Sequence, residues 1–302
     1  MEFLESLIPS ISAEGAVLVG LIASVFLYLW FLRGLRRSAV VKMNETPNSD
    51  GFSDTELERY ARHIVLREIG GVGQSKLSNA RVLVIGAGGL GSPVLQYLAA
   101  AGVGTIGVVD DDTVSLSNLQ RQVLFDEDQL GKPKVFAAQQ RLHAINPHVD
   151  ILPYHRRLET EEAQDLIAEF DLVLDGCDNF KTRSMVNSAC VATDVPLISG
   201  AISQWEGQIS LFHPKSGCPC YACVFDKEPS AGLAPSCAEA GVMGALPGIV
   251  GAMMAAEAIK YITGAGKTLA GDMIFVDALF GENRKMKLSR RADCAVCGAK
   301  PQ

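Results

Sequence analysis

The sequence predicts an α/β fold whose core is a doubly wound, mostly parallel sheet. A glycine-rich loop, Gly86–Gly91, follows a short apolar segment and precedes an apolar helical pattern, as in nucleotide-binding β-α-β units. Helical and extended patterns then alternate along the chain. Two Cys-x-x-Cys pairs, separated by about 70 residues, predict a C-terminal extension held by a structural zinc ion.

Composition restricts the class of protein. The chain has 302 residues and a formal net charge of −7, and it lacks the concentrated basic segment that binding of nucleic-acid phosphates requires. We therefore expect no nucleic acid but a small molecule or another protein as the partner. Of the 8 cysteines, four pair at ligand spacing and the other four are scattered through a large α/β pattern, which favours a reducing compartment over a disulfide framework.

The first 42 residues predict a membrane anchor. The segment from Gly15 to Leu32 is uncharged and is long enough to cross most of the hydrocarbon core of a bilayer. Acidic residues precede it and basic residues follow it, so the positive-inside rule predicts a single-pass protein with its catalytic domain in the cytoplasm. A cleaved signal peptide, a buried helix or a wrongly assigned start is the alternative, although the acidic start lacks a basic n-region.

Residues 43–52 are polar and aperiodic, and they predict a linker. Residues 53–302 then form the folded domain, which begins with a capping-box pattern at Ser53–Glu56 and a helix over 54–69. A strand at Arg81–Ile85, the glycine loop, a helix to Ala101 and a strand at Thr105–Asp110 come next.

The remaining elements continue this alternation. The patterns predict helices at 134–145, 161–170 and 181–192, and strands at 149–154, 172–175 and 197–201. The segment 240–256 is uncharged but contains Pro247, so we expect a buried helix that starts at the proline and not a second membrane span.

Polar clusters follow the predicted strands, at the sheet edge where such folds bind ligands. Asp110 follows the glycine loop by about 20 residues, the spacing of a carboxylate that holds ribose hydroxyls. Arg121 and Lys134 add cations, which a reaction at phosphate needs and a hydride transfer does not. Asp178, in the run Asp175–Asn179, is suited to a magnesium ion that keeps most of its water.

Seven motifs together resemble one family: GAGGLGS, DDDTVSLSNLQRQ, GKPK, DGCDN, CYAC, CAEAGVMG and CAVCG. They are similar to the ubiquitin-activating-like (ThiF/MoeB/HesA) adenylyltransferases that serve sulfur carriers, above all the molybdopterin-synthase branch, over residues 53–298. The resemblance implies a Rossmann-like adenylation fold. It also implies that Mg-ATP adenylates the C-terminal glycine of a small ubiquitin-like sulfur carrier, in molybdenum cofactor biosynthesis, before a separate sulfur donor protein supplies the thiocarboxylate sulfur.

The resemblance also assigns roles to individual residues. Those implied to contact the nucleotide are Gly86, Gly88, Gly89, Gly91, Asp110, Ser117, Asn118, Leu119, Gln120, Arg121, Lys134, Asp178 and Asn179. Those implied for catalysis are Arg62, Arg121, Lys134, Asp178, which would hold Mg2+, and Cys237, the thioester or persulfide position of some relatives. Arg62 would act in the partner subunit's site, which implies a homodimer. The zinc ligands are Cys220, Cys223, Cys294 and Cys297.

Other interpretations remain open at this point. A thiamine-pathway carrier adenylyltransferase would use nearly the same residues. An NAD-dependent oxidoreductase would use the glycine loop and Asp110, but it leaves the cations, Asp178 and the zinc pairs without a role. A membrane-tethered scaffold that binds a carrier without activating it is the third class. Arg62 on a solvated helix face and Asp175 as a turn cap are the structural alternatives for those two residues.

Overall fold

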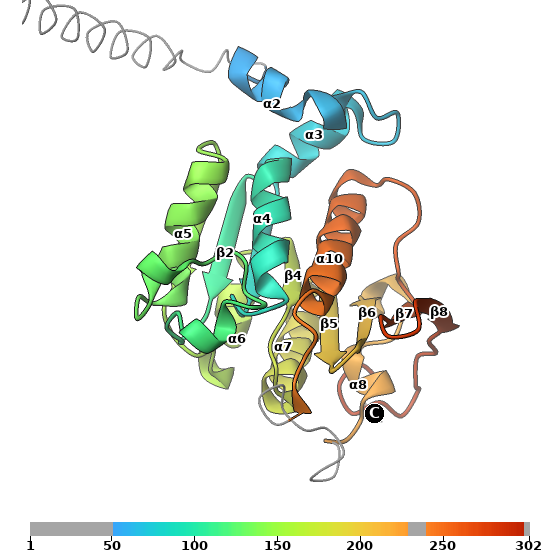
Figure 1. Cartoon of the computed structure of the whole chain (residues 1–302). Coiled ribbons are helices and arrows are strands. Elements are labelled where there is room, and N and C mark those ends of the chain that lie inside the picture. Colours follow the sequence, from blue (N-terminus) through green and yellow to red (C-terminus); the bar gives the residue numbers. More distant parts are fainter. Residues whose placement is uncertain (1–50, 229–239, 299–302) are drawn as a thin grey trace, which may run out of the picture. The chain divides into compact units, whose positions relative to one another are not determined.

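The structure is a computed structural model that describes residues 51–228 and 240–298 (Figure 1). The chain divides into two units, Met1–Glu58 and Arg59–Gln302, and the sheet lies in the second. The predicted membrane span, Gly15–Leu32, lies outside the described residues. Among the helices that the structure does describe, none is both long enough and apolar enough to cross a bilayer.

The second unit is built on one eight-stranded sheet with the order β3-β2-β1-β4-β5-β6-β7-β8. The parallel strands are β1 Arg81–Ile85, β2 Thr105–Val109, β3 Asp150–Tyr154, β4 Leu172–Asp175 and β5 Leu197–Ser203. The antiparallel strands are β6 Glu206–Phe212, β7 Asp272–Asp277 and β8 Glu282–Lys287. The predicted parallel sheet is therefore confirmed for β1 to β5, and three further strands extend it.

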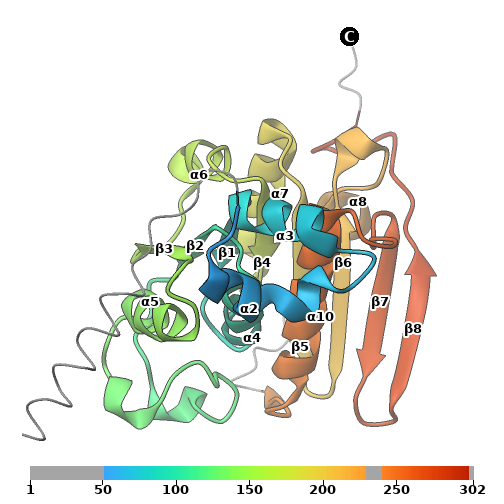
Figure 2. The ribbon, with the colours of Figure 1, turned by 90° about the horizontal axis from the view of Figure 1, so that it is seen from above.

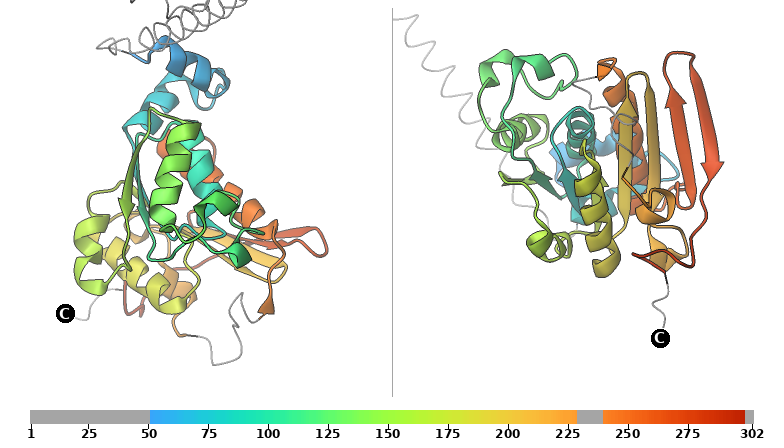
Figure 3. Two further views of the ribbon diagram at one scale, coloured as in Figure 1. Left: turned by 60° about the vertical axis from the view of Figure 1, so that its left-hand side comes forward. Right: turned by 90° about the horizontal axis from the view of Figure 1, so that it is seen from below.

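Helices cover both faces of this sheet, as Figures 2 and 3 show. One face carries α4 Gly91–Ala101, α5 Lys134–Ile145 and α10 Leu246–Thr263, and the other carries α6 Thr160–Ile167 and α7 Phe180–Thr193. The remaining helices are α2 Asp54–Ile64, α3 Gly70–Asn79 and the short α8 Tyr221–Val224, with 3-10 turns η2 Leu116–Asn118, η3 Glu127–Gln129 and η4 Pro214–Ser216.

Strand β1 explains the two-sided core. Val82 and Val84 are buried among the side chains of α4 and α10, whereas Leu83 and Ile85 are buried among those of α6 and α7. Successive side chains of a strand point to opposite faces, so a strand covered on both sides must be apolar throughout. This is why the sequence shows an uninterrupted apolar run here.

The predicted C-terminal end of the first helix is wrong. The helix expected over 54–69 ends at Ile64, and a separate helix, α3, begins at Gly70, whose φ of +61° lies in the left-handed region. A helix cannot continue through that backbone conformation, so the chain turns there. The helix expected at the proline is confirmed: α10 has Pro247 in its first turn, but it extends to Thr263.

Candidate nucleotide site and metal centre

The glycine loop joins β1 to α4, and the two ends of the loop pass close to each other. Gly86 has φ of +90°, and a Cβ atom placed on Gly91 would lie only 1.9 Å from the carbonyl oxygen of Gly86. Only glycine fits at position 91 while this loop keeps its conformation. Helix α4 begins directly after the loop, so the positive end of its dipole lies beside the loop, as at sites that bind phosphate. Of its first backbone groups, the N–H of Ser92 donates to the carbonyl of Gly88 at 2.9 Å and that of Val94 to the carbonyl of Leu90 at 3.4 Å.

Asp110 follows β2 and lies against the glycine loop. Its Oδ2 accepts a hydrogen bond from the N–H of Ala87 at 2.7 Å, and its Oδ1 accepts one from the N–H of Asp112 at 2.8 Å. Burial raises the pKa of the Asp110 carboxyl above its usual value, although nearby Lys134 opposes the shift. The structure thus brings the predicted ribose carboxylate beside the loop, where it also fixes the loop's backbone.

Arg121 and Asn118 also lie near the glycine loop. A Cβ atom on Gly89 would be 3.8 Å from Cγ of Arg121. The Oδ1 atom of Asn118 accepts hydrogen bonds from Nη2 of Arg121 at 2.8 Å and from Nε2 of Gln122 at 3.2 Å. Because both donors meet its oxygen, the amide nitrogen of Asn118 is left to donate elsewhere, which suits an anionic ligand.

Three neighbouring residues that were predicted to contact the nucleotide differ in their surroundings. Ser117 is exposed, and its carbonyl oxygen accepts a hydrogen bond from Nη1 of Arg121 at 3.0 Å. Leu119 packs against the hydrophobic core. Gln120 lies against Gly244, at which a Cβ atom would be 2.3 Å from Oε1 of Gln120. Leu119 thus belongs to the core packing, and the exposed Gln120 contacts the segment that precedes α10.

Lys134 starts α5 and is almost fully buried, with 3% of its surface exposed. Its Nζ atom forms an ion pair with Oδ2 of Asp112 at 2.8 Å. A buried ammonium group needs such a partner, because the loss of hydration would otherwise disfavour the charged form. The pair keeps a cation beside Asp110, at the edge of the sheet where the glycine loop begins.

The turn after β4 carries Asp178 and Asn179, both exposed. Asn179 caps α7, since its Oδ1 accepts a hydrogen bond from the N–H of Thr182 at 2.9 Å. The same turn abuts the glycine loop, because a Cβ atom on Gly86 would be 3.3 Å from the carbonyl oxygen of Gly176. The exposed carboxylate of Asp178, whose Oδ1 accepts a hydrogen bond from Nδ2 of Asn179 at 3.4 Å, fits Mg2+, which takes few protein ligands and keeps several waters.

Arg62, the residue expected to act in a partner subunit, is exposed on α2. Among the described residues, it has neither a hydrogen-bond partner nor an ion-pair partner. The same stretch of α2 is anchored to the domain: Nη1 of Arg59 donates to the carbonyl of Ile145 at 2.7 Å, and Nδ2 of Asn146 donates to the hydroxyl of Tyr60 at 2.8 Å. Arg62 is thus held on a fixed element with its charge directed to solvent.

The four predicted zinc ligands form one buried cluster. The Sγ atoms of Cys220 and Cys294 are 3.6 Å apart, those of Cys223 and Cys297 3.4 Å, and those of Cys220 and Cys223 3.9 Å. A tetrahedral zinc ion with Zn–S bonds of about 2.3 Å separates its sulfur ligands by about 3.8 Å. The cluster therefore fits a metal ion, with zinc as the metal that four thiolates favour.

The surroundings of the cluster favour thiolate formation at one ligand. Burial alone would raise the pKa of Cys294, but hydrogen bonds from the N–H groups of Cys297 and Val296 and from neighbouring thiols outweigh it and lower the pKa to about 7. Cys218 lies outside the cluster, and its Sγ donates to the carbonyl of His213 at 3.1 Å. Cys237 falls outside the described residues.

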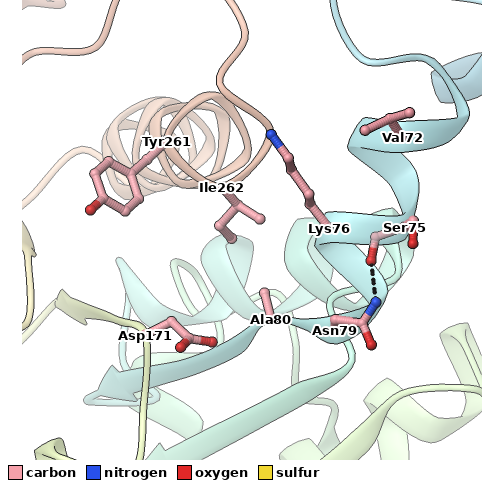
Figure 4. A pocket seen from close by; sticks show the side chains of 8 residues that line it. All are labelled: Val72, Ser75, Lys76, Asn79, Ala80, Asp171, Tyr261 and Ile262. Atoms are coloured by element: carbon pink, nitrogen blue, oxygen red, sulfur yellow. Dashed lines mark hydrogen bonds between the residues drawn. The ribbon is translucent and has the colours of Figure 1, made fainter.

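A separate open pocket of about 650 Å³ lies at the opposite edge of the parallel sheet, where the strands begin (Figure 4). Within it, Nζ of Lys76 donates to the carbonyl of Thr263 at 3.2 Å. Its lining residues are Val72, Ser75, Lys76, Asn79, Ala80, Asp171, Tyr261 and Ile262. None of the predicted nucleotide residues is among them.

Two residues near that edge were not selected from the sequence. Gln122 is 4% exposed and lies behind Asn118, and Arg183 is 7% exposed beneath the turn that carries Asp178. The polar pattern around Asn118 gives a signal for Gln122. For Arg183 the sequence offers only a carboxylate at the end of a predicted buried strand and an arginine in the helix that follows. Such a pair also occurs often as an exposed ion pair, so it does not predict a buried arginine.

The chain is similar to known proteins in sequence and in fold. The model of the ThiF family matches residues 60–296. A sulfur carrier protein adenylyltransferase from Thermus thermophilus is 50% identical over 255 residues, which cover 83% of this chain and 94% of that protein. The molybdopterin-synthase adenylyltransferase of Escherichia coli is 47% identical over 247 residues, covering 82% and 98%. The crystal structure of E. coli MccB with ATP has a TM-score of 0.71 at 25% identity, covering 83% of this chain and 75% of that one.

Proposed function

Because the chain belongs to the ThiF family, we propose that it uses ATP to adenylate the C-terminal glycine of a small ubiquitin-like sulfur carrier protein. The observation that carries this proposal is that the glycine loop, Asp110, Arg121, Lys134 and Asp178 all lie at one edge of the parallel sheet. This is a nucleotidyltransferase reaction. The two relatives from Thermus thermophilus and Escherichia coli are named adenylyltransferases, and the match covers nearly their whole length.

The geometry supports an in-line displacement at the α-phosphorus of ATP. A carboxylate oxygen of the carrier forms the new P–O bond, while the bond to the bridging oxygen breaks and pyrophosphate leaves with its electron pair. The glycine loop and the positive end of the α4 dipole face the phosphates, and Asp110 accepts from the ribose hydroxyls. Arg121 and Lys134 neutralise the charge that develops on the phosphates. Mg2+, held by Asp178, would supply further neutralisation of that charge.

The same cations decide against an NAD-dependent oxidoreductase. Such an enzyme needs the glycine loop and a ribose carboxylate, but hydride transfer gives no role to a buried lysine and an arginine beside the phosphates. An inert scaffold would have no need of either cation or of Asp178. The NAD enzyme and the scaffold remain outcomes of the test below.

For the carrier we propose the small subunit of molybdopterin synthase, with the thiamine-pathway carrier as the alternative. The E. coli relative supports molybdenum cofactor biosynthesis, whereas the Thermus relative is named only for a sulfur carrier. A separate protein then supplies sulfur to the adenylated carrier. A homodimer in which Arg62 reaches the partner's site, a zinc ion on the cysteine cluster and a membrane anchor at residues 1–42 complete the proposal.

The test is ATP–pyrophosphate exchange by the full chain in detergent, with Mg2+ and each of the two carriers in turn. We expect exchange that requires one carrier with its C-terminal glycine and that is lost in Asp178→Ala. Absence of exchange with either carrier, together with tight NAD binding, would overturn the proposal in favour of an oxidoreductase. Carrier binding without exchange or NAD binding would support the scaffold.

Membrane attachment has its own test, since catalysis does not depend on it. We expect the full chain to sediment with membranes and to resist extraction by high salt, and we expect a chain that begins at Gly51 to stay in the supernatant with exchange activity retained. A full chain that is released by salt alone would contradict the anchor and leave the catalytic proposal intact.

A further inference from the structure

Arg183 is a buried cation that none of the steps above uses. It lies in the first turn of α7, and only 7% of its surface is exposed. Its Nη1 atom donates to the carbonyl of Gly200 at 2.7 Å and to Oγ of Ser199 at 3.1 Å. Its Nη2 atom donates to the carbonyl of Cys177. The guanidinium group therefore joins the turn after β4 to the neighbouring strand β5.

Asp175 is the counter-charge of this arginine. It is fully buried at the end of β4, and its Oδ2 is 3.6 Å from Nη1 of Arg183 and accepts a hydrogen bond from Oγ of Ser199 at 3.1 Å. Its Oδ1 accepts from the N–H of Cys177 at 3.0 Å, which is the turn contact that the sequence suggested. Burial lowers the pKa of Arg183, but Asp175 outweighs this effect and raises it, so the guanidinium stays charged.

The network holds both backbone polar groups of Cys177. The N–H of Cys177 is held by Asp175 and its carbonyl by Arg183, and the next residue but one, Asn179, is held by its cap on α7. Asp178 lies between these two fixed points. Its backbone has little freedom left, although its carboxylate is exposed beside the glycine loop.

We infer that Arg183, with Asp175 and Ser199, is a positioning residue that aims the Asp178 carboxylate at the metal–nucleotide complex. The inference rests on the proposed function and deepens it. A guanidinium fork suits this role because it meets several carbonyl and hydroxyl oxygens in a fixed plane, which the single ammonium of lysine cannot do. Residues that orient a metal ligand change metal affinity by about 10- to 100-fold when they are replaced.

The test measures binding and not turnover. Calorimetry of the full chain with a non-hydrolysable ATP analogue, with and without Mg2+, gives the factor by which the metal tightens nucleotide binding. In Arg183→Lys we expect this factor to fall by about tenfold, while the affinity without metal stays within about twofold. Asp178→Ala should lose the same factor. Lys181→Ala, a change of an exposed cation on the same helix, should keep it.

Chemical rescue separates positioning from folding. Added guanidinium ion, at concentrations far below those that unfold proteins, should restore the metal-dependent factor to Arg183→Ala and should not restore it to Asp178→Ala. If Arg183→Ala does not fold, Ser199→Ala removes one contact of the same network and should give an intermediate loss. A native metal-dependent factor in Arg183→Lys and in Ser199→Ala would overturn the inference. A native chain that binds no ATP analogue would instead overturn the proposed function.

Discussion

Individual glycines decide whether the nucleotide loop can form. At Gly91 the missing side chain makes room for the carbonyl oxygen of Gly86, and a Cβ atom there would lie 1.9 Å from it. Gly88 belongs to the same loop, but the nearest atom to a Cβ atom at that position is Nε2 of Gln122, at 3.7 Å. The two positions therefore carry different steric constraints although they share one motif.

Gly91→Ala should destabilise the protein, because the carbonyl of Gly86 and the start of α4 must move apart. We expect a loss of about 1–3 kcal/mol in the free energy of unfolding, as for other overpacked sites. Gly88→Ala, the matched control, should change it by less than about 1 kcal/mol. Urea unfolding without nucleotide measures both, and equal losses in the two variants would contradict this account of the loop.

Asp272 offers a test that depends on pH. It is fully buried in β7, and ion pairs with Lys287 at 2.7 Å and Lys285 at 2.9 Å lower its pKa to about 2. Because the folded pKa lies below the unfolded value of 3.8, its contribution to stability is fully present above pH 3.8 and is lost as the pH falls through 2. The β7–β8 hairpin should therefore weaken in acid.

The measurement compares native protein with Asp272→Asn in urea at a series of pH values. We expect the native protein to be more stable at pH 6, and we expect the difference between the two to narrow as the pH falls below 4. Glu282→Gln, which alters an exposed carboxylate of the same hairpin, is the control. A stability difference that is independent of pH would show that the two lysines do not hold Asp272 ionised.

At the level of elements, the cysteine cluster joins the segment after β6 to the segment after β8. Cys220 is the N-cap residue of α8 and Cys223 lies within that helix, which follows β6, whereas Cys294 and Cys297 follow β8. We expect one zinc ion per chain, and Cys294→Ser should lose it and lower the Tm by about 5–10 °C. Cys218→Ser is the matched control, since Cys218 lies outside the cluster. Full zinc content in Cys294→Ser, measured by elemental analysis, would contradict the assignment.

The sequence predicts the parallel half of the sheet better than the rest for a physical reason. Strands β1 to β5 are covered by helices, so each appears as a short apolar run between helical patterns. Every residue of β8 is exposed, and its residues, ENRKMK, show no alternation that would indicate a strand. Helix α3 has three glycines and loop-like composition; burial of Gln74 and Leu77 against the domain, and not propensity, stabilises it.

For the whole molecule, the sequence predicts the polar groups that lie beside the glycine loop but not the buried arginine that holds the neighbouring turn. Asp110 and Lys134 sit at positions where a β-α-β unit must place polar residues, so their side chains were expected at this edge. The part that Arg183 plays depends on the register of β4 with β5, which pairs Asp175 with Ser199. No local pattern encodes that pairing, and so the network appears only in three dimensions.

Subunit cooperation gives a prediction at this scale. If Arg62 acts in the partner's site, Arg62→Ala and Lys134→Ala should each be inactive alone, and mixing them should restore activity. A two-fold dimer then contains one intact site per mixed dimer, so random exchange should return about one quarter of native activity. Exchange of subunits can be confirmed by native mass spectrometry. Mixed dimers without activity would place Arg62 in its own chain's site.

The cysteine cluster also changes the unfolded chain. A metal ion that joins Cys220 to Cys294 and Cys223 to Cys297 closes a loop that contains α10, β7 and β8. Closing a loop of about 75 residues removes conformational entropy worth about 4 kcal/mol at room temperature. If the thiolates keep the ion under denaturing conditions, the unfolded chain contains a closed loop. Refolding then begins from fewer chain conformations. Zinc would then speed the docking of α10, whose first turn packs on the glycine loop. The rate at which the nucleotide site forms would therefore depend on the supply of the metal.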